Sequence, residues 1–366
     1  AGTSINMNIN EVIANRATEI LGGKKGEYLV HPIDHVNLHQ STNDTFPTAA
    51  KIAVIVRLRE LVESVIKLQE AVQEKEKQFY SIRKPGRTQL MDGPPIMLGQ
   101  EFGAFADALA RDRWRLHKVE ERIRSVNIGG TAIGTGIGAP KDFILKIVEK
   151  VREVTKVKIA KAENLIDATQ NWDVFSEIHG LLKSLSVNLY KISNDIRLLS
   201  SGPNTAIGEL IPPKVQAGSS IMPGKINPVI PEYVMQICHV VFGNDVVITH
   251  CCSLGNLELN QFAPAIVHFT LKSLKLLNKA CLSLRKYVLK IEANAERCEE
   301  NLRRSTSNLT PLIKIFGYEE VSEAIKKANW DFAKALRILA ERHSMSYDEL
   351  LERLNLKKMT GLGYAL

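Results

Sequence analysis

Long stretches with helical periodicity constrain the fold of this chain more than any other feature. Residues 48–80 carry apolar side chains at spacings of three and four, with charged residues between them. Similar stretches cover residues 97–126, 142–154, 172–199, 231–252 and 261–293. Several of these exceed the usual length of a helix in a globular domain, which favours a bundle. We therefore predict an all-α protein built around long central helices.

One of these stretches is apolar over most of its circumference. Residues 234–248 place valine, isoleucine or phenylalanine at eight positions, so no single face is polar. A helix of this kind needs apolar partners on several sides. We expect some of those partners to come from other copies of the chain.

The C-terminal part of the chain has a different character. After Cys298 the predicted helices are shorter and more charged, over residues 322–328, 331–343 and 347–354. A change of this kind is typical of a domain boundary. We predict a small helical domain over residues 298–366.

Composition excludes several classes of function. The net charge is +8, but Lys and Arg are spread among acidic residues, so we expect no nucleic-acid partner. No apolar run reaches bilayer-spanning length and no secretion signal is visible, so we expect no membrane partner. The five cysteines are odd in number and lie in helix-like sequence. They predict neither disulfides nor a metal site, and they indicate a reducing, cytoplasmic location.

Residues 218–228 read Gly-Ser-Ser-Ile-Met-Pro-Gly-Lys-Ile-Asn-Pro, and this string says most about function. Two glycines and two prolines predict a loop. Its polar groups are the hydroxyls of Ser219 and Ser220, the ammonium of Lys225 and the carboxamide of Asn227. Such a set suits a small, oxygen-rich anion. The alternative is a plain turn, since turns favour Ser and Asn as well.

Three further polar segments are less specific than this loop. Ser41, Thr42 and Asn43 precede the long helix predicted to start near Pro47, where they could bind an anion or cap the helix. Residues 86–95 hold Arg87, which could grip a carboxylate or form a surface ion pair. Residues 1–8 carry Thr3 and alternating asparagines, a weak signal alone.

The glycine-rich run over residues 129–138 suggests a phosphate-binding loop at first sight. It lacks the Lys-Ser/Thr ending of a P-loop and does not match Gly-x-Gly-x-x-Gly. A glycine-rich bend that lets backbone pass close to a site is the better interpretation.

Taken together, the polar segments resemble the motifs of the fumarase/aspartase superfamily over essentially the whole chain. The matching segments are Gly2-Thr3-Ser4, Ser41-Thr42-Asn43-Asp44, Gly86-Arg87-Thr88-Gln89, Gly218 to Pro228, and Glu232. The chain looks closest to the aspartases. It has Gln89 where fumarases usually carry His, and Thr42 where they typically show a second Ser.

The resemblance implies four subunits that pack into one helix bundle, with each active site formed by loops of three different subunits. It implies reversible deamination of L-aspartate to fumarate and ammonia, without a metal or other cofactor. It also implies that residues 1–41 are the remnant of an N-terminal domain whose preceding segment is missing. Residues 42–297 then form the central long-helix domain.

Carried over residue by residue, the resemblance assigns roles to the polar groups. Ser219 is the base that removes a proton from carbon, with assistance from Lys225, and the product is an aci-carboxylate intermediate. The substrate-binding residues are Thr3, Ser41, Thr42 and Ser220 at the aci-carboxylate, Thr88, Lys225 and Asn227 at the other carboxylate, and Asn43 and Gln89 at the departing group. Met222 and Glu232 are expected to support the site.

Two alternatives remain open on the sequence. The chain could be a fumarate hydratase that interconverts malate and fumarate, because the signature loop is less specific for substrate than for superfamily. It could also be a catalytically retired helical scaffold. The intact set of Ser219, Lys225 and Asn227 argues against that second alternative.

Overall fold

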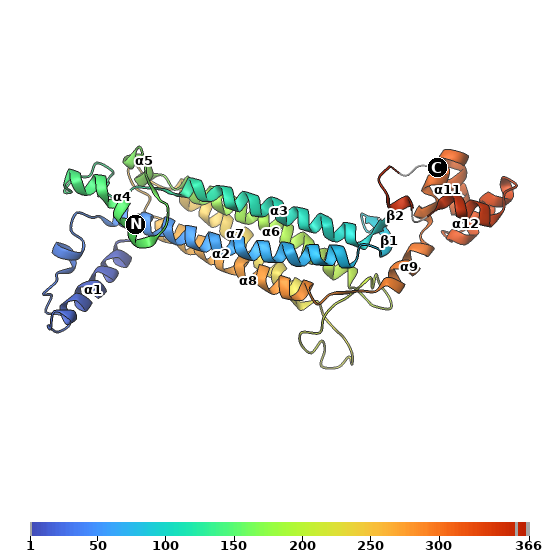
Figure 1. Cartoon of the computed structure of the whole chain (residues 1–366), viewed down its shortest axis with the longest axis horizontal. Coiled ribbons are helices and arrows are strands. Elements are labelled where there is room, and N and C mark those ends of the chain that lie inside the picture. The colour runs from blue at the N-terminus through green and yellow to red at the C-terminus, as the bar shows by residue number, and fades with distance from the viewer. Residues whose placement is uncertain (1, 356–357, 364–366) are drawn as a thin grey trace. The chain divides into compact units, whose positions relative to one another are not determined.

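Helices dominate the computed structural model, which describes residues 2–355 and 358–363 (Figure 1). The chain divides into two compact units. The first unit comprises Ala1–Ile66, Leu109–Tyr190 and Tyr233–Leu282, and the second comprises Lys67–Ala108, Lys191–Glu232 and Ser283–Leu366. The predicted boundaries at residues 41/42 and 297/298 stay a prediction.

Five long helices contribute segments to both units. They are α2 (Thr42–Gln78), α3 (Leu98–Ile123), α6 (Asp173–Leu199), α7 (Val229–Ser253) and α8 (Ala263–Val288). Their bounds lie within a few residues of most of the predicted stretches. The all-α, long-helix prediction is therefore confirmed.

Shorter elements connect and extend these helices. The shorter α-helices are α1 (Thr3–Ile20), α4 (Lys141–Thr155), α5 (Leu165–Gln170), α9 (Ala295–Arg304), α10 (Ile313–Phe316), α11 (Tyr318–Lys327), α12 (Phe332–Arg342) and α13 (Tyr347–Leu354). A π-helical turn covers Pro32–Val36, and 3₁₀ turns cover Thr306–Leu312 and Lys358–Thr360. The strands form three two-stranded sheets: β1 (Arg83–Thr88) with β2 (Met91–Met97), β3 (Ser125–Val126) with β4 (Ala160–Lys161), and β5 (Leu210–Ile211) with β6 (Glu292–Ala293).

Two of these elements differ from expectation. Residues 1–8 were expected as a polar segment, but Thr3 begins α1, a helix rich in asparagine, which has low helix propensity. Residues 86–95 were expected as a polar loop, but they lie in the antiparallel β1–β2 hairpin. Its proline and glycine content hides the strand pattern, because both residues are depleted in strands.

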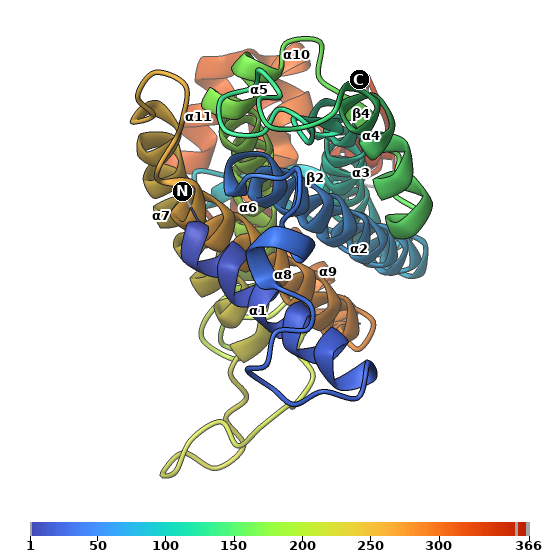
Figure 2. The ribbon, with the colours of Figure 1, turned by 90° about the vertical axis from the view of Figure 1, so that its left-hand side faces the viewer.

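In the first unit, segments of α2, α6, α7 and α8 run side by side around a shared core (Figures 1 and 2). Leu58 on α2, Leu182 on α6, Ile248 on α7 and Leu274 on α8 have at most 1% of their surface exposed. Burial of one such side chain contributes about 1.5–3 kcal/mol. The apolar stripes that predict the helices therefore also hold them together.

In the second unit, the C-terminal helices have an apolar cluster of their own. It joins the Thr306–Leu312 turn to α11, α12 and α13 through buried side chains. Leu309, Leu336 and Leu350 at its centre are fully buried.

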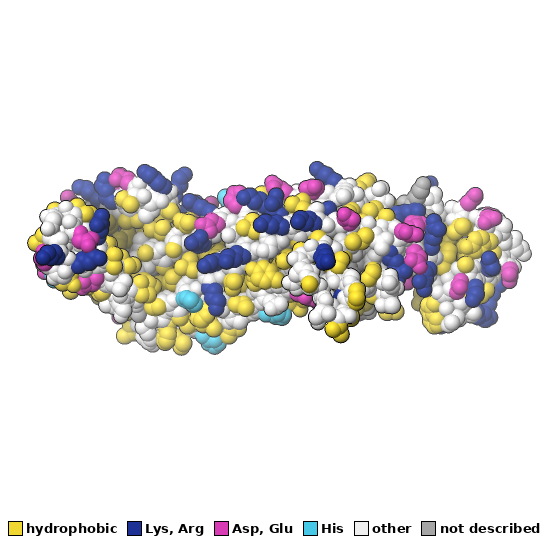
Figure 3. All heavy atoms as spheres, turned by 90° about the horizontal axis from the view of Figure 1, so that it is seen from below, with side chains coloured by type: hydrophobic (Ala, Val, Ile, Leu, Met, Phe, Trp, Pro, Cys, Tyr) yellow, Lys and Arg dark blue, Asp and Glu magenta, His cyan; other side chains and the backbone are white. Residues whose placement is uncertain are grey.

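Helix α7 is long and apolar enough to cross a membrane by length and composition, alone among the helices of the described residues. The expectation that no apolar run reaches that length is therefore wrong for this helix. Only 39% of its most apolar window is buried within the chain, and Val240, Val246 and Val247 are exposed. The core helix of a soluble protein can have the same length and composition. In Figure 3, hydrophobic side chains likewise lie at the surface among charged ones.

A polar cluster is buried in the core of the first unit. His179 on α6 is fully buried, with Nδ1 3.0 Å from Asp245 Oδ1 and Nε2 2.9 Å from Ser273 Oγ. Asn244 Nδ2 donates to the same hydroxyl over 3.0 Å. Burial lowers the pKa of His179, although the hydrogen bond to Asp245 opposes the shift. The imidazole is therefore part of a buried, hydrogen-bonded network in the core of this unit.

This cluster predicts that stability falls in mild acid. Because the folded-state pKa of His179 lies below its ordinary 6.5, the unfolded chain binds a proton more readily. The contribution of the neutral, buried His179 to the free energy of unfolding is complete above pH 6.5 and is lost as the pH falls below that value. Lowering the pH from 7.5 to 5.5 should therefore reduce the free energy of unfolding, by no more than about 1.4 kcal/mol per pH unit below 6.5 for this group. Urea unfolding of the wild type and His179→Asn at fixed protein concentration measures the difference.

The control is His117→Asn, which changes an exposed histidine on α3 of the same unit. It should keep the wild-type pH dependence, whereas His179→Asn should flatten it. Equal pH dependence in all three proteins would contradict the assignment.

Candidate active site

The Ser41–Asn43 segment forms the beginning of α2. Ser41 Oγ accepts a hydrogen bond from Asn43 N over 3.2 Å, and Asp44 Oδ1 accepts one from Ser41 N over 3.0 Å. This reciprocal pair is a capping arrangement that satisfies free N–H groups at the helix start. The helix therefore begins at Thr42 rather than near Pro47.

The glycine-rich run holds this helix start in place. Asp44 is fully buried, and its Oδ2 accepts from Gly129 N over 3.0 Å and Thr131 N over 2.9 Å. Asn43 Nδ2 donates to Ala132 O over 2.8 Å. Burial raises the pKa of Asp44 even though these backbone N–H groups oppose the shift. Gly129 has φ 92°, a conformation that glycine adopts at little cost. The run is thus the bend that its sequence indicates.

Thr3 lies in the same unit, at the first position of α1. The preceding residue, Gly2, has φ 96°, and a Cβ there would lie 3.0 Å from the ring of Phe46. Thr45 Oγ1 donates to Asn6 Oδ1 over 3.2 Å. The start of α1 therefore packs on the first turns of α2, at Thr45 and Phe46.

Thr88 and Gln89 lie in the second unit, at the turn of the β1–β2 hairpin. Thr88 pairs with Met91, so Gln89 and Leu90 form a two-residue turn. Both have positive φ, 53° and 66°, as a type I′ turn requires. Thr88 and Gln89 are exposed, and Gln89 lines a cavity of about 270 Å³ together with Arg87 and Lys191.

The signature loop follows β5 in the same unit and has no regular secondary structure before Val229. Ser219 Oγ accepts from two backbone groups, Ile221 N at 3.2 Å and Met222 N at 3.1 Å. Asn227 Nδ2 donates to Gly218 O over 2.6 Å and closes the loop on itself. The N–H groups around Ser219 can stabilise negative charge on its oxygen.

Ser219, Met222 and Lys225 line one cavity of about 230 Å³ inside this loop. None of residues 218–228 lines the cavity that contains Gln89. Ser220 is exposed, and Ile221 is 83% exposed. Glu232 lies in the first turn of α7, with Oε1 3.7 Å from Arg197 Nε. The predicted residues of the second unit are therefore grouped in two places.

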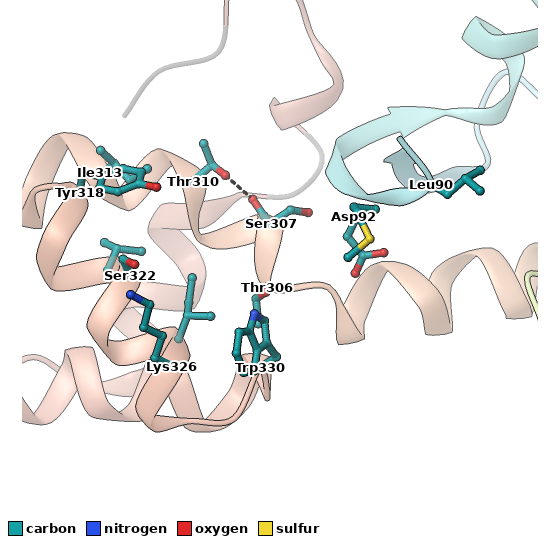
Figure 4. Close-up of a pocket in the computed structure, with 13 residues that line it drawn as sticks. Leu90, Asp92, Thr306, Ser307, Thr310, Ile313, Tyr318, Ser322, Lys326 and Trp330 are labelled. Atoms are coloured by element: carbon teal, nitrogen blue, oxygen red, sulfur yellow. Dashed lines mark hydrogen bonds between the residues drawn. The ribbon is translucent and has the colours of Figure 1, made fainter. Parts of the chain in front are cut away.

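A further cavity of about 500 Å³ lies between the hairpin turn and the C-terminal helices (Figure 4). Leu90 and Asp92 come from the hairpin, and Ser307, Lys326 and Trp330 come from the C-terminal segments. It contains none of the predicted site residues. In the part of the chain that is described, no group of three or more His, Cys, Asp or Glu side chains is arranged to hold a metal ion.

Sequence reasoning missed two residues that the structure makes prominent. Asp44 could have been found, since an acidic residue three positions after Ser41 is a capping signal. Glu209 gave no local signal. It is fully buried, and Arg87 donates to both of its oxygens, over 2.9 Å and 2.7 Å. The carboxylate that Arg87 grips is therefore one of the protein's own.

Gly218 offers a test of the loop geometry. A Cβ on Gly218 would lie 1.6 Å from Lys225 O, whereas a Cβ on Gly224 would meet nothing within 4 Å. Gly218→Ala should therefore open the loop, and amide hydrogen exchange over residues 214–228 should become at least about tenfold faster. Gly224→Ala carries only the strain of φ 77°, about 1–2 kcal/mol, and should change exchange less. Wild-type exchange in Gly218→Ala would contradict this geometry.

Comparison with known proteins gives consistent results. A family model described as "Lyase" matches residues 1–243. Aspartate ammonia-lyase of Helicobacter pylori is 44% identical over 349 residues, which cover 93% of this chain and 75% of that protein. Aspartate ammonia-lyase of a Bacillus species is 40% identical over 368 residues, which cover 100% of this chain and 78% of that protein.

Solved structures show the same relationship. A Brucella melitensis protein described as fumarate lyase:delta crystallin superposes with a TM-score of 0.92 at 41% identity, covering 99% of this chain and 79% of that one. A class II fumarase of Schistosoma mansoni gives a TM-score of 0.90 at 29% identity, covering 99% of this chain and 80% of that one.

Proposed function

Because this chain belongs to the fumarase/aspartase superfamily of lyases, we propose that it converts L-aspartate reversibly to fumarate and ammonia. The observation that carries the substrate assignment is the similarity to aspartate ammonia-lyases, at 40–44% identity over nearly the whole chain. The identity to the class II fumarase is lower, at 29%.

We assign the base to Ser219. A serine hydroxyl is a poor base at neutral pH, so its oxygen must be held in an alkoxide-like form. The N–H groups of Ile221 and Met222, which donate to Ser219 Oγ, support that role. Lys225 lines the same cavity and supplies positive charge. The oxygen removes a proton from the carbon beside one substrate carboxylate, and ammonia then leaves from the next carbon.

The proton on that carbon is very weakly acidic, so its loss requires donors placed to stabilise the aci-carboxylate. We assign this role to Thr3, Ser41, Thr42 and Ser220. The start of α2 supports the assignment, since helix N-termini favour anions. Thr88, Lys225 and Asn227 hold the other carboxylate, and Asn43 and Gln89 face the amine. Met222 and Glu232 support the loop that carries Ser219. No cofactor has a part in this proposal.

We propose that the active protein is a homotetramer whose sites combine segments of three subunits. Two observations support this. Gln89 and Ser219 line separate cavities within one chain. In addition, apolar side chains on α7 and on the signature loop, such as Val246 and Ile221, are exposed in the single chain. A cytoplasmic location, with neither a nucleic acid nor a membrane as partner, stays a prediction.

The substrate assignment is tested by offering the purified protein L-aspartate and L-malate separately and following fumarate by ultraviolet absorbance. Fumarate should form from aspartate. Fumarate from malate alone would make the protein a fumarate hydratase, and none from either substrate would favour the scaffold alternative.

The base assignment is tested with Ser219→Ala. General-base contributions are typically 10²–10⁴-fold, so kcat should fall by about that range or more while the thermal midpoint stays near that of the wild type. Ser253→Ala removes a hydroxyl that bonds His250 O at the end of α7, and it should leave kcat unchanged. A Ser219→Ala protein with a near-normal rate would remove Ser219 from this role.

A further inference from the structure

The turn that carries Thr88 and Gln89 is strained. A type I′ turn needs positive φ at both central positions, and glycine or asparagine normally occupies them. Here they are Gln89 and Leu90, with φ 53° and 66°. Such residues cost about 1–3 kcal/mol each and persist only where the surroundings hold them.

A buried group of charges lies directly behind this turn. Glu209 is fully buried, and Lys84 is 1% exposed. Arg87 grips both oxygens of Glu209, and Lys84 Nζ lies 3.2 Å from Glu209 and 3.0 Å from Glu101. Two positive and two negative side chains therefore balance. Burial disfavours charge on Arg87, but its bonds to Glu209 raise its pKa above the ordinary value.

Both cations reach the same carboxylate from one strand of the hairpin. In a regular strand, residues three apart point to opposite faces, but the hairpin is irregular between Lys84 and Arg87. The β1–β2 register shifts between Pro85 and Arg87, where one β1 residue, Gly86, lies opposite two β2 residues, Gly93 and Pro94, so the extra residue of the bulge is on β2. A Cβ on Gly86 would lie 2.9 Å from Pro94 O, so the bulge has little room for another residue type.

Glu209, which both cations contact, is itself held in place by the surrounding backbone. Glu209 N donates to Leu199 O over 2.8 Å, and Glu209 O accepts from Asn294 N over 2.9 Å. Asn301 Nδ2 donates to Glu209 Oε1 over 3.0 Å. Glu209 therefore connects the end of α6 and the start of α9 to the hairpin.

We propose that Glu209 and Arg87 are positioning residues that hold the Thr88–Gln89 turn ready for substrate. A buried ion pair is weak as a source of stability, because apolar groups of the same volume often do as well. A bidentate pair does fix orientation, and it does so one residue away from Thr88. This inference rests on the proposed role of Thr88 and Gln89 in binding the substrate.

The test is Arg87→Lys, which keeps the charge and loses the fork. KM for L-aspartate should rise about tenfold or more, because a displaced turn binds the substrate less tightly. The change in kcat should be smaller, since a loss of uniform binding raises KM alone. Amide hydrogen exchange over residues 86–92 should become faster, while the thermal midpoint stays within a few degrees of the wild type. Glu209→Asp, which draws the carboxylate back, should act in the same direction.

The matched control is Arg83→Lys. Arg83 lies on the same strand and pairs with Glu299 at 3.1 Å, away from the turn. It should change neither KM nor the exchange of residues 86–92. The double variant Arg87→Lys/Glu209→Asp should raise KM and exchange no more than the more affected single variant does, since both changes break the same Arg87–Glu209 pair.

The two proposals fail separately. If the wild type does not act on aspartate, the proposed function is wrong, and hydrogen exchange alone then tests whether the Arg87–Glu209 pair holds the turn. If the wild type is active but Arg87→Lys and Glu209→Asp leave both KM and exchange unchanged, the positioning role of Arg87 and Glu209 is wrong and the proposed function stands.

Discussion

The single chain leaves apolar helix surface exposed to solvent, and the proposed assembly depends on this surface. Helix α7 is apolar on most sides, yet Val240, Val246 and Val247 remain exposed. The signature loop likewise exposes Ile221, beside the proposed base. Where such side chains form a contiguous patch, they are typical of an interaction site. The proposed assembly of four chains would cover it and would bring polar segments of different subunits together at the same time.

Each of these polar segments is held by hydrogen bonds within the single chain. The start of α2 is fixed by the Ser41–Asp44 cap and by the N–H groups of the glycine-rich run. The signature loop is closed by Asn227 on Gly218, where only glycine fits. The hairpin turn rests on the buried carboxylate of Glu209. Rigid supports of this kind allow a site to be assembled from separate pieces with accurate geometry.

The sequence predicts the long helices because their apolar positions recur at the period of a helix, and the structure places most of the boundaries within a few residues. It does not predict α1, whose asparagines hide its helical character, or the β1–β2 hairpin, whose prolines and glycines hide the strands. For the site, the motif residues are visible in the sequence, but their supports are visible only in part. Asp44 follows from the spacing of a helix cap, whereas Glu209 meets Arg87 across 122 residues, and no local pattern records such a contact.

The central claim is that one active site takes the Ser219 loop and the Thr88 turn from different chains. Its most direct test mixes two inactive variants, Ser219→Ala and Thr88→Val, by joint refolding in equal amounts. If the segments come from different subunits, about a quarter of the sites in the mixed tetramers are intact, so aspartate deamination should return to about that fraction of the wild-type rate. If each chain builds its own site, every site carries one defect. Mixed tetramers that form but stay inactive would contradict the account.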